Sequence, residues 1–247
     1  MVGERVREPG AALGVLPGLS IVMPCYNEVE NLVASVSAAQ SAAQLFAHEH
    51  EIVIVDDGSA DGTGALARDL ATAIPELRIV SHARNRGYGA AVRSGIDAAT
   101  MPYLLLTDGD GQFDLMELEA FLPHAPGFDL VVGRRARRAD PLGRRLGARG
   151  WNALVTHLFR LPVRDVDCAF KLMRRDVVQA LPLTADGAMV STELLAHALA
   201  RGATVQELDV AHLPRRTGEQ SGGSLPVIAR AFRELVVVGR RIRSARR

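Results

Sequence analysis

The sequence predicts an α/β domain, Rossmann-like in layout, with a mostly parallel central sheet and helices on both faces. Two observations predict it: short β-branched apolar runs alternate with longer stretches of helical periodicity, and those runs are apolar throughout. A strand that is apolar at every position belongs to a sheet covered on both faces, and alternating strands and helices favour parallel pairing. The length of 247 residues fits one such domain.

The elements are expected in a regular order. The run LSIVMP predicts a strand at 19–24, and the periodic stretch after it predicts a helix at 30–46 with Asn27 as a possible N-cap. EIVIV predicts a strand at 51–55, and a turn-rich segment then leads into a helix near 63–72. The remaining expected elements are a strand at 77–82, a small-residue helix at 88–99, and strands at 103–107 and 128–133.

The chain is expected to divide into a tail, one domain and a terminal helix. Residues 1–18 lack the continuous apolar core of a signal peptide and are expected to form a flexible tail. The domain is expected at 19–224 and an amphipathic basic helix or tail at 225–247. No run approaches the roughly 18 to 20 apolar residues of a membrane-spanning helix. The expected location is therefore cytoplasmic, peripheral on the cytoplasmic face of the membrane.

Composition narrows the classes of function. A formal net charge of +1 argues against a protein that coats nucleic acid. Cys25 and Cys168 lie far apart with no CxxC pair, so a structural zinc site or a disulfide framework is not expected, and both should be reduced thiols. Neither disorder nor a fibrous repeat fits a chain with 48% hydrophobic and 23% charged residues.

Polar residues follow four of the predicted strands. Residues 24–28 (PCYNE) end the first strand, Asp56 and Asp57 the second, the segment 108–110 (DGD) the fourth, and 133–135 (GRR) the fifth. Ligands of parallel sheets bind beyond the carboxyl ends of the strands. We therefore expect a single site on this edge of the sheet.

The Asp108-Gly109-Asp110 segment is a candidate metal site. Two carboxylates at an extended strand end suit Mg²⁺ or Mn²⁺ together with a diphosphate, and Gly109 lets a ligand approach the backbone. Turn chemistry alone also explains the segment, as a turn and helix cap also explains Asp56 and Asp57. An EF-hand is excluded because Phe113 occupies the position where that loop requires glycine.

Two other nucleotide-binding classes fit poorly. In RNRGYGAAVRSG (84–95) the third glycine of a dinucleotide fingerprint is missing, which disfavours a Rossmann dehydrogenase. A sugar-phosphate nucleotidyltransferase would carry a glycine-rich loop and a lysine after the first strand, where this sequence has PCYNE.

Four segments in order, PCYNEVENL, VDDGSADGT, RNRGYGAAVRSG and LLLTDGDGQFD, resemble the inverting family-two glycosyltransferases of the GT-A fold. In the second half VVGRR, GARGWN, DVDCAFKLMRRD and PRRTGEQSGG look like the dolichyl-phosphate and polyprenyl-phosphate sugar synthases. The resemblance implies transfer of a hexose from a nucleotide sugar, of the GDP-mannose or UDP-glucose type, to a lipid phosphate. The alternatives are a soluble hydroxyl or polysaccharide acceptor, and a catalytically silent nucleotide-sugar-binding module.

The resemblance also implies roles for individual residues. Asp108 and Asp110 would bind Mg²⁺ or Mn²⁺, and with Arg135 and Arg215 they form the expected catalytic set. The donor would be held by Pro24, Tyr26, Glu28, Asp56, Asp57, Gly109 and Gln112. The acceptor phosphate would be held by Arg135, Arg149, Arg215 and Ser221.

The sequence departs from the family pattern on the acceptor side. Arg134 replaces a small hydroxyl residue, Asp167 and Ala169 replace a Thr and a Gly, and the loop from Arg215 to Ser221 is one residue longer.

A phosphate acceptor with a second pKa of about 6 is already ionised near neutral pH and needs no general base. The other arginines of 134–149 are also explained as a solvated basic face.

Three further features have no firm assignment from sequence. Lys171 is the sole lysine of the chain, and Glu193 is given a supporting role only. The terminal helix is expected to lie on an anionic membrane or to dock on the domain. Its apolar stripe is expected to comprise Ile228, Phe232, Leu235 and Ile242.

Overall fold

The computed structural model describes residues 14–138, 142–214 and 225–245. In chain order the elements are β1 (Leu16–Cys25), α1 (Val29–Phe46), β2 (Ala47–Asp56), α2 (Thr63–Ala73), β3 (Leu77–Ser81), α3 (Tyr88–Ala98), β4 (Tyr103–Leu106), the 3₁₀ helices η1 (Leu115–Ala120) and η2 (Leu122–His124), β5 (Leu130–Arg138), α4 (Leu142–Phe159), β6 (Lys171–Arg174), α5 (Arg175–Gln179), α6 (Met189–Ala200), β7 (Val205–His212) and α7 (Leu225–Ala245).

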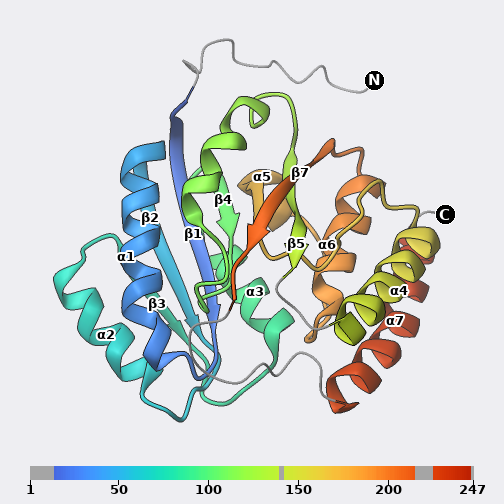
Figure 1. The fold of residues 1–247 in the computed structure, drawn as a ribbon, viewed down its shortest axis with the longest axis horizontal. Helices are drawn as coiled ribbons and strands as arrows, with labels where there is room; N and C mark the ends of the chain where they lie inside the picture. Colours follow the sequence, from blue (N-terminus) through green and yellow to red (C-terminus); the bar gives the residue numbers. More distant parts are fainter. Residues whose placement is uncertain (1–13, 139–141, 215–224, 246–247) are drawn as a thin grey trace.

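Within the described ranges the strands form one sheet in the order β3-β2-β1-β4-β6-β5-β7 (Figure 1). β1 pairs in parallel with β2 and β4, β2 with β3, and β5 with β7. β6 pairs antiparallel with both β4 and β5, so β5 and β7 run in the direction of β1. The predicted mostly parallel α/β sheet is confirmed, whereas β6 and β7 were not among the predicted strands.

The sheet is covered on both faces, as its wholly apolar strands predict. Alternate residues of one strand face opposite sides, and in β1 Ile21 packs with one apolar cluster and Val22 with the other. The first cluster includes residues of α1, α2, η1 and η2, and the second includes residues of α3 to α7. Figure 1 shows α1 and α2 at one end of the sheet and α4, α6 and α7 at the other.

Three boundaries differ from the prediction. β1 begins at Leu16, earlier than the strand expected at 19–24. β5 continues to Arg138, which places Gly133, Arg134 and Arg135 inside a strand that pairs with β7 rather than at its end. Asn27 is not the N-cap of α1: that position is Glu28, and the Asp61 carboxylate accepts the hydrogen bond of the Val29 N–H at 3.0 Å.

None of the described helices combines the length and the apolar character that crossing a bilayer requires.

Candidate functional site

The loops after β1 and β2 are joined to each other at the carboxyl edge of the sheet. Asn27, in the left-handed region at φ 55°, accepts a hydrogen bond from the Ala60 N–H at 2.9 Å. The Asn27 N–H donates to Ser59 Oγ at 2.9 Å, and the Glu28 N–H donates to Thr63 Oγ1 at 2.9 Å. The PCYNE and DDGSADGT segments are therefore one structural unit, although more than thirty residues separate these partners in sequence.

The Asp108-Gly109-Asp110 turn is held tightly against β1 and α1. Ser35 of α1 donates from its hydroxyl to the Gly109 carbonyl at 2.8 Å. A Cβ added at Gly109 would lie 2.5 Å from Cys25 Sγ, so this position has no room for a side chain. Gly109 is thus needed for close packing of the turn, and its backbone is fixed by a neighbouring helix.

The described part of the chain leaves one carboxylate oxygen of Asp108 without a hydrogen bond. Its Oδ1 atom is buried and has no hydrogen-bond partner among the described residues. Burial, followed by the nearby charge of Asp110, raises the pKa of Asp108 to about 7, and the hydrogen bond from the Tyr88 hydroxyl opposes that shift. A buried carboxylate without its full set of partners is costly for the fold, and a divalent cation would supply the missing charge.

Asp110 is the second carboxylate of the turn. It is 9% exposed, and its Oδ1 accepts the Gln112 N–H at 3.0 Å. In the described ranges no three His, Cys, Asp or Glu side chains gather closely enough to form a metal cage. Two carboxylates alone fit Mg²⁺ or Mn²⁺, whose remaining ligands come from water and substrate phosphates. The donor set therefore fits the predicted metal.

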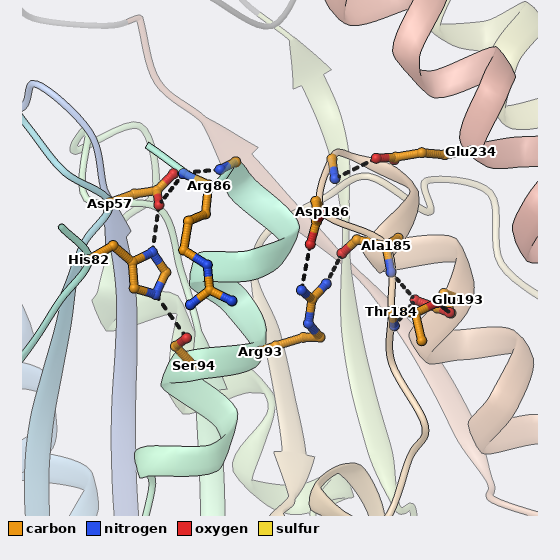
Figure 2. A network of polar contacts seen from close by, with 12 residues as sticks. Asp57, His82, Arg86, Arg93, Ser94, Thr184, Ala185, Asp186, Glu193 and Glu234 are labelled. Carbon is orange, nitrogen blue, oxygen red and sulfur yellow. Dashed lines mark hydrogen bonds and ion pairs between the residues drawn. The ribbon is translucent and has the colours of Figure 1, made fainter. Parts of the chain in front are cut away.

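Asp57 lies at the predicted edge, but its carboxylate is occupied by the protein. Oδ1 lies 2.6 Å from His82 Nδ1 and accepts the Arg86 N–H at 2.9 Å, while Oδ2 accepts the Gly87 N–H at 2.8 Å (Figure 2). His82 in turn contacts Ser94 Oγ of α3 through Nε2 at 2.9 Å. Asp57 thus fixes the loop that precedes α3.

The other predicted donor residues differ in how open they are. Tyr26 is 44% exposed beside the edge, and Glu28 accepts a hydrogen bond from Asn31 at 2.7 Å. Pro24 is buried within β1, and the Asp56 carboxylate accepts the Ser59 N–H at 3.0 Å. Of these four, Tyr26 presents the largest free surface to a ligand.

Gln112 connects the Asp108-Gly109-Asp110 turn to the end of β7. Its Nε2 donates to the Leu213 carbonyl at 3.0 Å, and the Leu213 N–H donates to the Gln112 carbonyl at 2.9 Å. The side-chain amide that was expected to contact the donor therefore anchors the segment that leads toward Arg215. Arg215 and Ser221 themselves lie outside the described residues, as does the side chain of Arg149 in α4.

Arg135 forms an ion pair with a carboxylate that the sequence did not single out. Asp165 accepts from Arg135 Nε and Nη2 at 2.7 Å each, in a bidentate pair with side chains only 12% and 7% exposed. The neighbouring Arg134 forms the same kind of pair with Asp209, at 2.5 and 2.8 Å, on an exposed face. The two arginines thus have similar partners and very different burial.

Lys171 and Glu193 are both fully buried. Lys171 donates to the Cys168 carbonyl, and burial lowers its pKa. Glu193 accepts from the Thr184 and Ala185 N–H groups at 2.8 Å each and from the Thr184 hydroxyl at 2.7 Å (Figure 2). The supporting role expected for Glu193 is therefore structural support of a loop.

The terminal helix α7 docks on the domain with part of its predicted stripe. Ile242 is 2% exposed and Leu235 packs against the same core cluster, whereas Ile228 and Phe232 lie outside the described side chains. The outward face carries Val236 and Val237, which are 54% and 46% exposed. The described residues of the predicted apolar stripe, Leu235 and Ile242, thus attach α7 to the domain core.

Sequence reasoning missed Ser35, Tyr88 and Asp165. Each acts on a predicted site residue that is distant in the sequence, 74 residues away for Ser35 and 30 for Asp165. Neither a motif nor a local spacing identifies such partners. For Tyr88 a weak signal existed, because it begins the predicted small-residue helix directly after a glycine.

Comparison with known proteins identifies related chains. The model of the family described as "Glycosyl transferase family 2" matches residues 20–181. The undecaprenyl-phosphate 4-deoxy-4-formamido-L-arabinose transferase of Photorhabdus laumondii subsp. laumondii is 30% identical over 213 residues, which is 85% of this chain and 64% of that protein. The protein of the same name from Pseudomonas fluorescens is 31% identical over 217 residues, covering 87% and 62%. This chain therefore spans slightly less than two thirds of these relatives.

Solved structures with the same fold include glucosyl-3-phosphoglycerate synthase from Mycobacterium tuberculosis. Its complex with Mn²⁺, UDP and glucosyl-3-phosphoglycerate aligns with a TM-score of 0.64 at 19% identity, covering 93% of this chain and 78% of that one. The complex with Mn²⁺, UDP and phosphoglyceric acid gives 0.65 at 18%, covering 93% and 77%. These alignments bear out the expected GT-A fold.

Proposed function

This chain belongs to glycosyl transferase family 2, and we propose that it is an inverting glycosyltransferase that moves a sugar from a nucleotide sugar to a polyprenyl phosphate. The observation that carries the proposal is the buried Oδ1 of Asp108 at the carboxyl edge of the sheet, which has no hydrogen-bond partner among the residues that the structure describes. The relatives named for undecaprenyl phosphate support the acceptor. Within the proposal the sugar is a hexose carried by UDP or GDP.

On the donor side Asp108 and Asp110 would hold Mg²⁺ or Mn²⁺, in line with the Mn²⁺ of the neighbouring structures. When bound, the cation offsets the negative charge that develops on the leaving diphosphate. The protein supplies the rigidity that this requires. Ser35 fixes the turn through the Gly109 carbonyl, and the Tyr88 hydroxyl orients the Asp108 carboxylate.

On the acceptor side the chemistry needs placement rather than a base. A phosphate monoester is already ionised near neutral pH and attacks the anomeric carbon directly, with inversion. Arg135 is suited to hold the acceptor phosphate because Asp165 fixes the orientation of its planar guanidinium group. Neighbouring acidic groups raise the pKa of that guanidinium and so keep it charged. Arg149, Arg215 and Ser221 complete the proposed acceptor set.

The test is transfer of labelled sugar from UDP-glucose or GDP-mannose in the presence of Mn²⁺ or Mg²⁺. One arm contains a short-chain polyprenyl phosphate and the other contains soluble hydroxyl acceptors. Label in the solvent-extractable fraction, lost in Asp110→Ala, is the expected result. Label only in the soluble arm would replace the lipid acceptor with a soluble one, and no transfer from any donor would favour a silent binding module.

A lipid acceptor also implies contact with a membrane. The outward face of α7 places Val236 and Val237 beside Arg233, Arg240 and Arg241, all of them exposed, a combination that suits the surface of an anionic leaflet. We expect the double variant Val236→Ser, Val237→Ser to sediment less with liposomes that contain anionic lipid. Val33→Ser is the matched control, because Val33 is equally exposed, at 53%, on the distant helix α1. Equal loss in both proteins would remove α7 from the membrane contact.

A further inference from the structure

The 184–187 loop, which lies between α5 and α6, is contacted by three helices. Glu193 of α6 accepts its first two N–H groups, as described above. Figure 2 shows the same loop facing α3 on one side and Glu234 of α7 on the other. This loop is therefore the point where the terminal helix and α3 are joined.

The contact with α3 is close and polar. The Gly89 N–H donates to the Asp186 carbonyl at 2.8 Å, and a Cβ at Gly89 would collide with the Ala185 carbonyl. Arg93, one turn along α3, donates to that same carbonyl and pairs with Asp186 Oδ1 at 2.5 Å. The first turns of α3 thus pack directly against the 184–187 loop, with backbone touching backbone.

On the other side, a carboxylate of α7 contacts the loop. Glu234 Oε1 accepts the Gly187 N–H at 2.9 Å, and a Cβ at Gly187 would lie 2.7 Å from Glu234 Oε2. Both residues are partly buried, so water replaces this hydrogen bond less readily than at an open surface. Glu234 therefore restrains the loop at the residue that follows Asp186.

The other end of this connection lies at the candidate metal turn. Tyr88 begins α3 and immediately precedes Gly89, and its hydroxyl lies close enough to Asp108 to lower the pKa of that carboxyl. A shift of the loop would move Gly89 and with it the ring of Tyr88. The position of Tyr88 is thus determined from both sides, by Asp57 through the loop before α3 and by the 184–187 loop after it.

From this geometry we infer that Glu234 is a positioning residue for Asp108: it holds the 184–187 loop against α3 so that Tyr88 stays on the carboxylate. The inference rests on the proposed function in that Asp108 is taken as a metal ligand. Glu234 contacts the 184–187 loop through the Gly187 N–H. The effect of Glu234 should therefore be transmitted through Tyr88 and should follow its acceptance of the Gly187 N–H.

The first experiment needs no ligand. Hydrogen exchange of the full chain is compared between the wild type, Glu234→Ala and Glu234→Gln, with exposed Glu119→Ala of η1 as a control for loss of a carboxylate. Glu234→Ala should speed exchange of the Gly89 amide roughly tenfold, because the loop that accepts its hydrogen bond is released. Glu234→Gln should exchange more slowly than Glu234→Ala, since its amide oxygen can still accept the Gly187 N–H. Unchanged exchange in Glu234→Ala would overturn the inference.

The second experiment measures Mn²⁺ binding from the loss of the free-ion electron paramagnetic resonance signal. Glu234→Ala and Tyr88→Phe should each raise the dissociation constant about tenfold, as changes behind a metal ligand commonly do. The double variant should bind no more weakly than Tyr88→Phe, because both changes break one connection. Additive effects would refute transmission through Tyr88. A wild type that binds no Mn²⁺ would instead remove the proposed metal site, and the exchange experiment would still decide the role of Glu234.

Discussion

Removing the carboxylate of Asp165 tests how the protein keeps Arg135 buried. The substitution Asp165→Asn retains the shape of the side chain and one acceptor oxygen but removes its charge. Arg135, whose side chain is 12% exposed, then keeps a guanidinium charge without its ionic partner. The matched variant is Asp209→Asn, which breaks the same bidentate geometry around Arg134, where the side chains are 29% and 55% exposed.

The expected magnitudes follow from this difference in burial. Breaking a buried ion pair by removing one partner costs about 3 to 5 kcal/mol, and the acceptor retained by asparagine favours the lower end. An exposed pair contributes about 0.2 to 1 kcal/mol. With a urea m-value of about 3 kcal/mol/M, Asp165→Asn should lower the unfolding midpoint by about 1 M and Asp209→Asn by about 0.2 M.

Urea unfolding at pH 7, followed by circular dichroism, measures both midpoints. At 1 M NaCl the small effect of Asp209→Asn should shrink further, because salt screens exposed charges, while that of Asp165→Asn should persist. Equal shifts in the two variants would refute the assignment of Arg135 to a buried, carboxylate-dependent position. The same Asp165→Asn protein should also lose affinity for the acceptor phosphate, since its guanidinium fork is no longer fixed.

Three other predictions concern the metal turn and the thiols. Gly109→Ala should destabilise the fold by about 1 to 3 kcal/mol and weaken Mn²⁺ binding, since the new methyl would lie against Cys25 Sγ; thermal unfolding with and without Mn²⁺ measures both. Burial raises the pKa of Asp108 to about 7, so the folded protein binds a proton there that the unfolded chain has already lost. The free energy of unfolding of the wild type should therefore fall as the pH rises from about 4 to 7. Asp108→Asn should be more stable than the wild type at pH 8 without metal and equal to it near pH 4. Burial raises the pKa of Cys25 above its usual range and that of Cys168 to about 12. Neither thiol should therefore react with iodoacetamide at pH 8 until urea unfolds the protein. Rapid labelling of the native chain would contradict this.

The site illustrates which inferences local sequence supports. Placement of Asp108 and Asp110 at the edge of the sheet follows from strand alternation alone, because parallel strands bring their carboxyl ends to one side. The antiparallel strand β6 was missed because its sequence, KLMR, has a charged residue at each end, and its pairing with β4 spans more than sixty residues. β7 was missed because its sequence, VQELDVAH, lacks the apolar run on which the other strands were recognised.

Residue type predicted that carboxylates lie at the carboxyl edge of the sheet, but not which of them have hydrogen-bond partners in the folded protein. Asp57 and Asp108 are both carboxylates at strand ends, and nothing in their local sequence separates them. In the structure Asp57 is occupied by His82 and two backbone N–H groups, whereas Asp108 Oδ1 has no described partner. The partners of Asp57 lie 25 to 30 residues away.

The sequence by itself determined the α/β class, the strands of the first half of the chain and the set of polar groups at the carboxyl edge. These depend on hydrophobic periodicity and turn chemistry, which operate over a few residues. The tertiary structure alone decided that Asp108 Oδ1 is buried without a partner among the described residues, that Asp165 holds Arg135, and that Glu234 reaches the 184–187 loop. Each of these depends on which distant segments meet after folding, because a buried charge is defined by all its neighbours and not by its place in the chain.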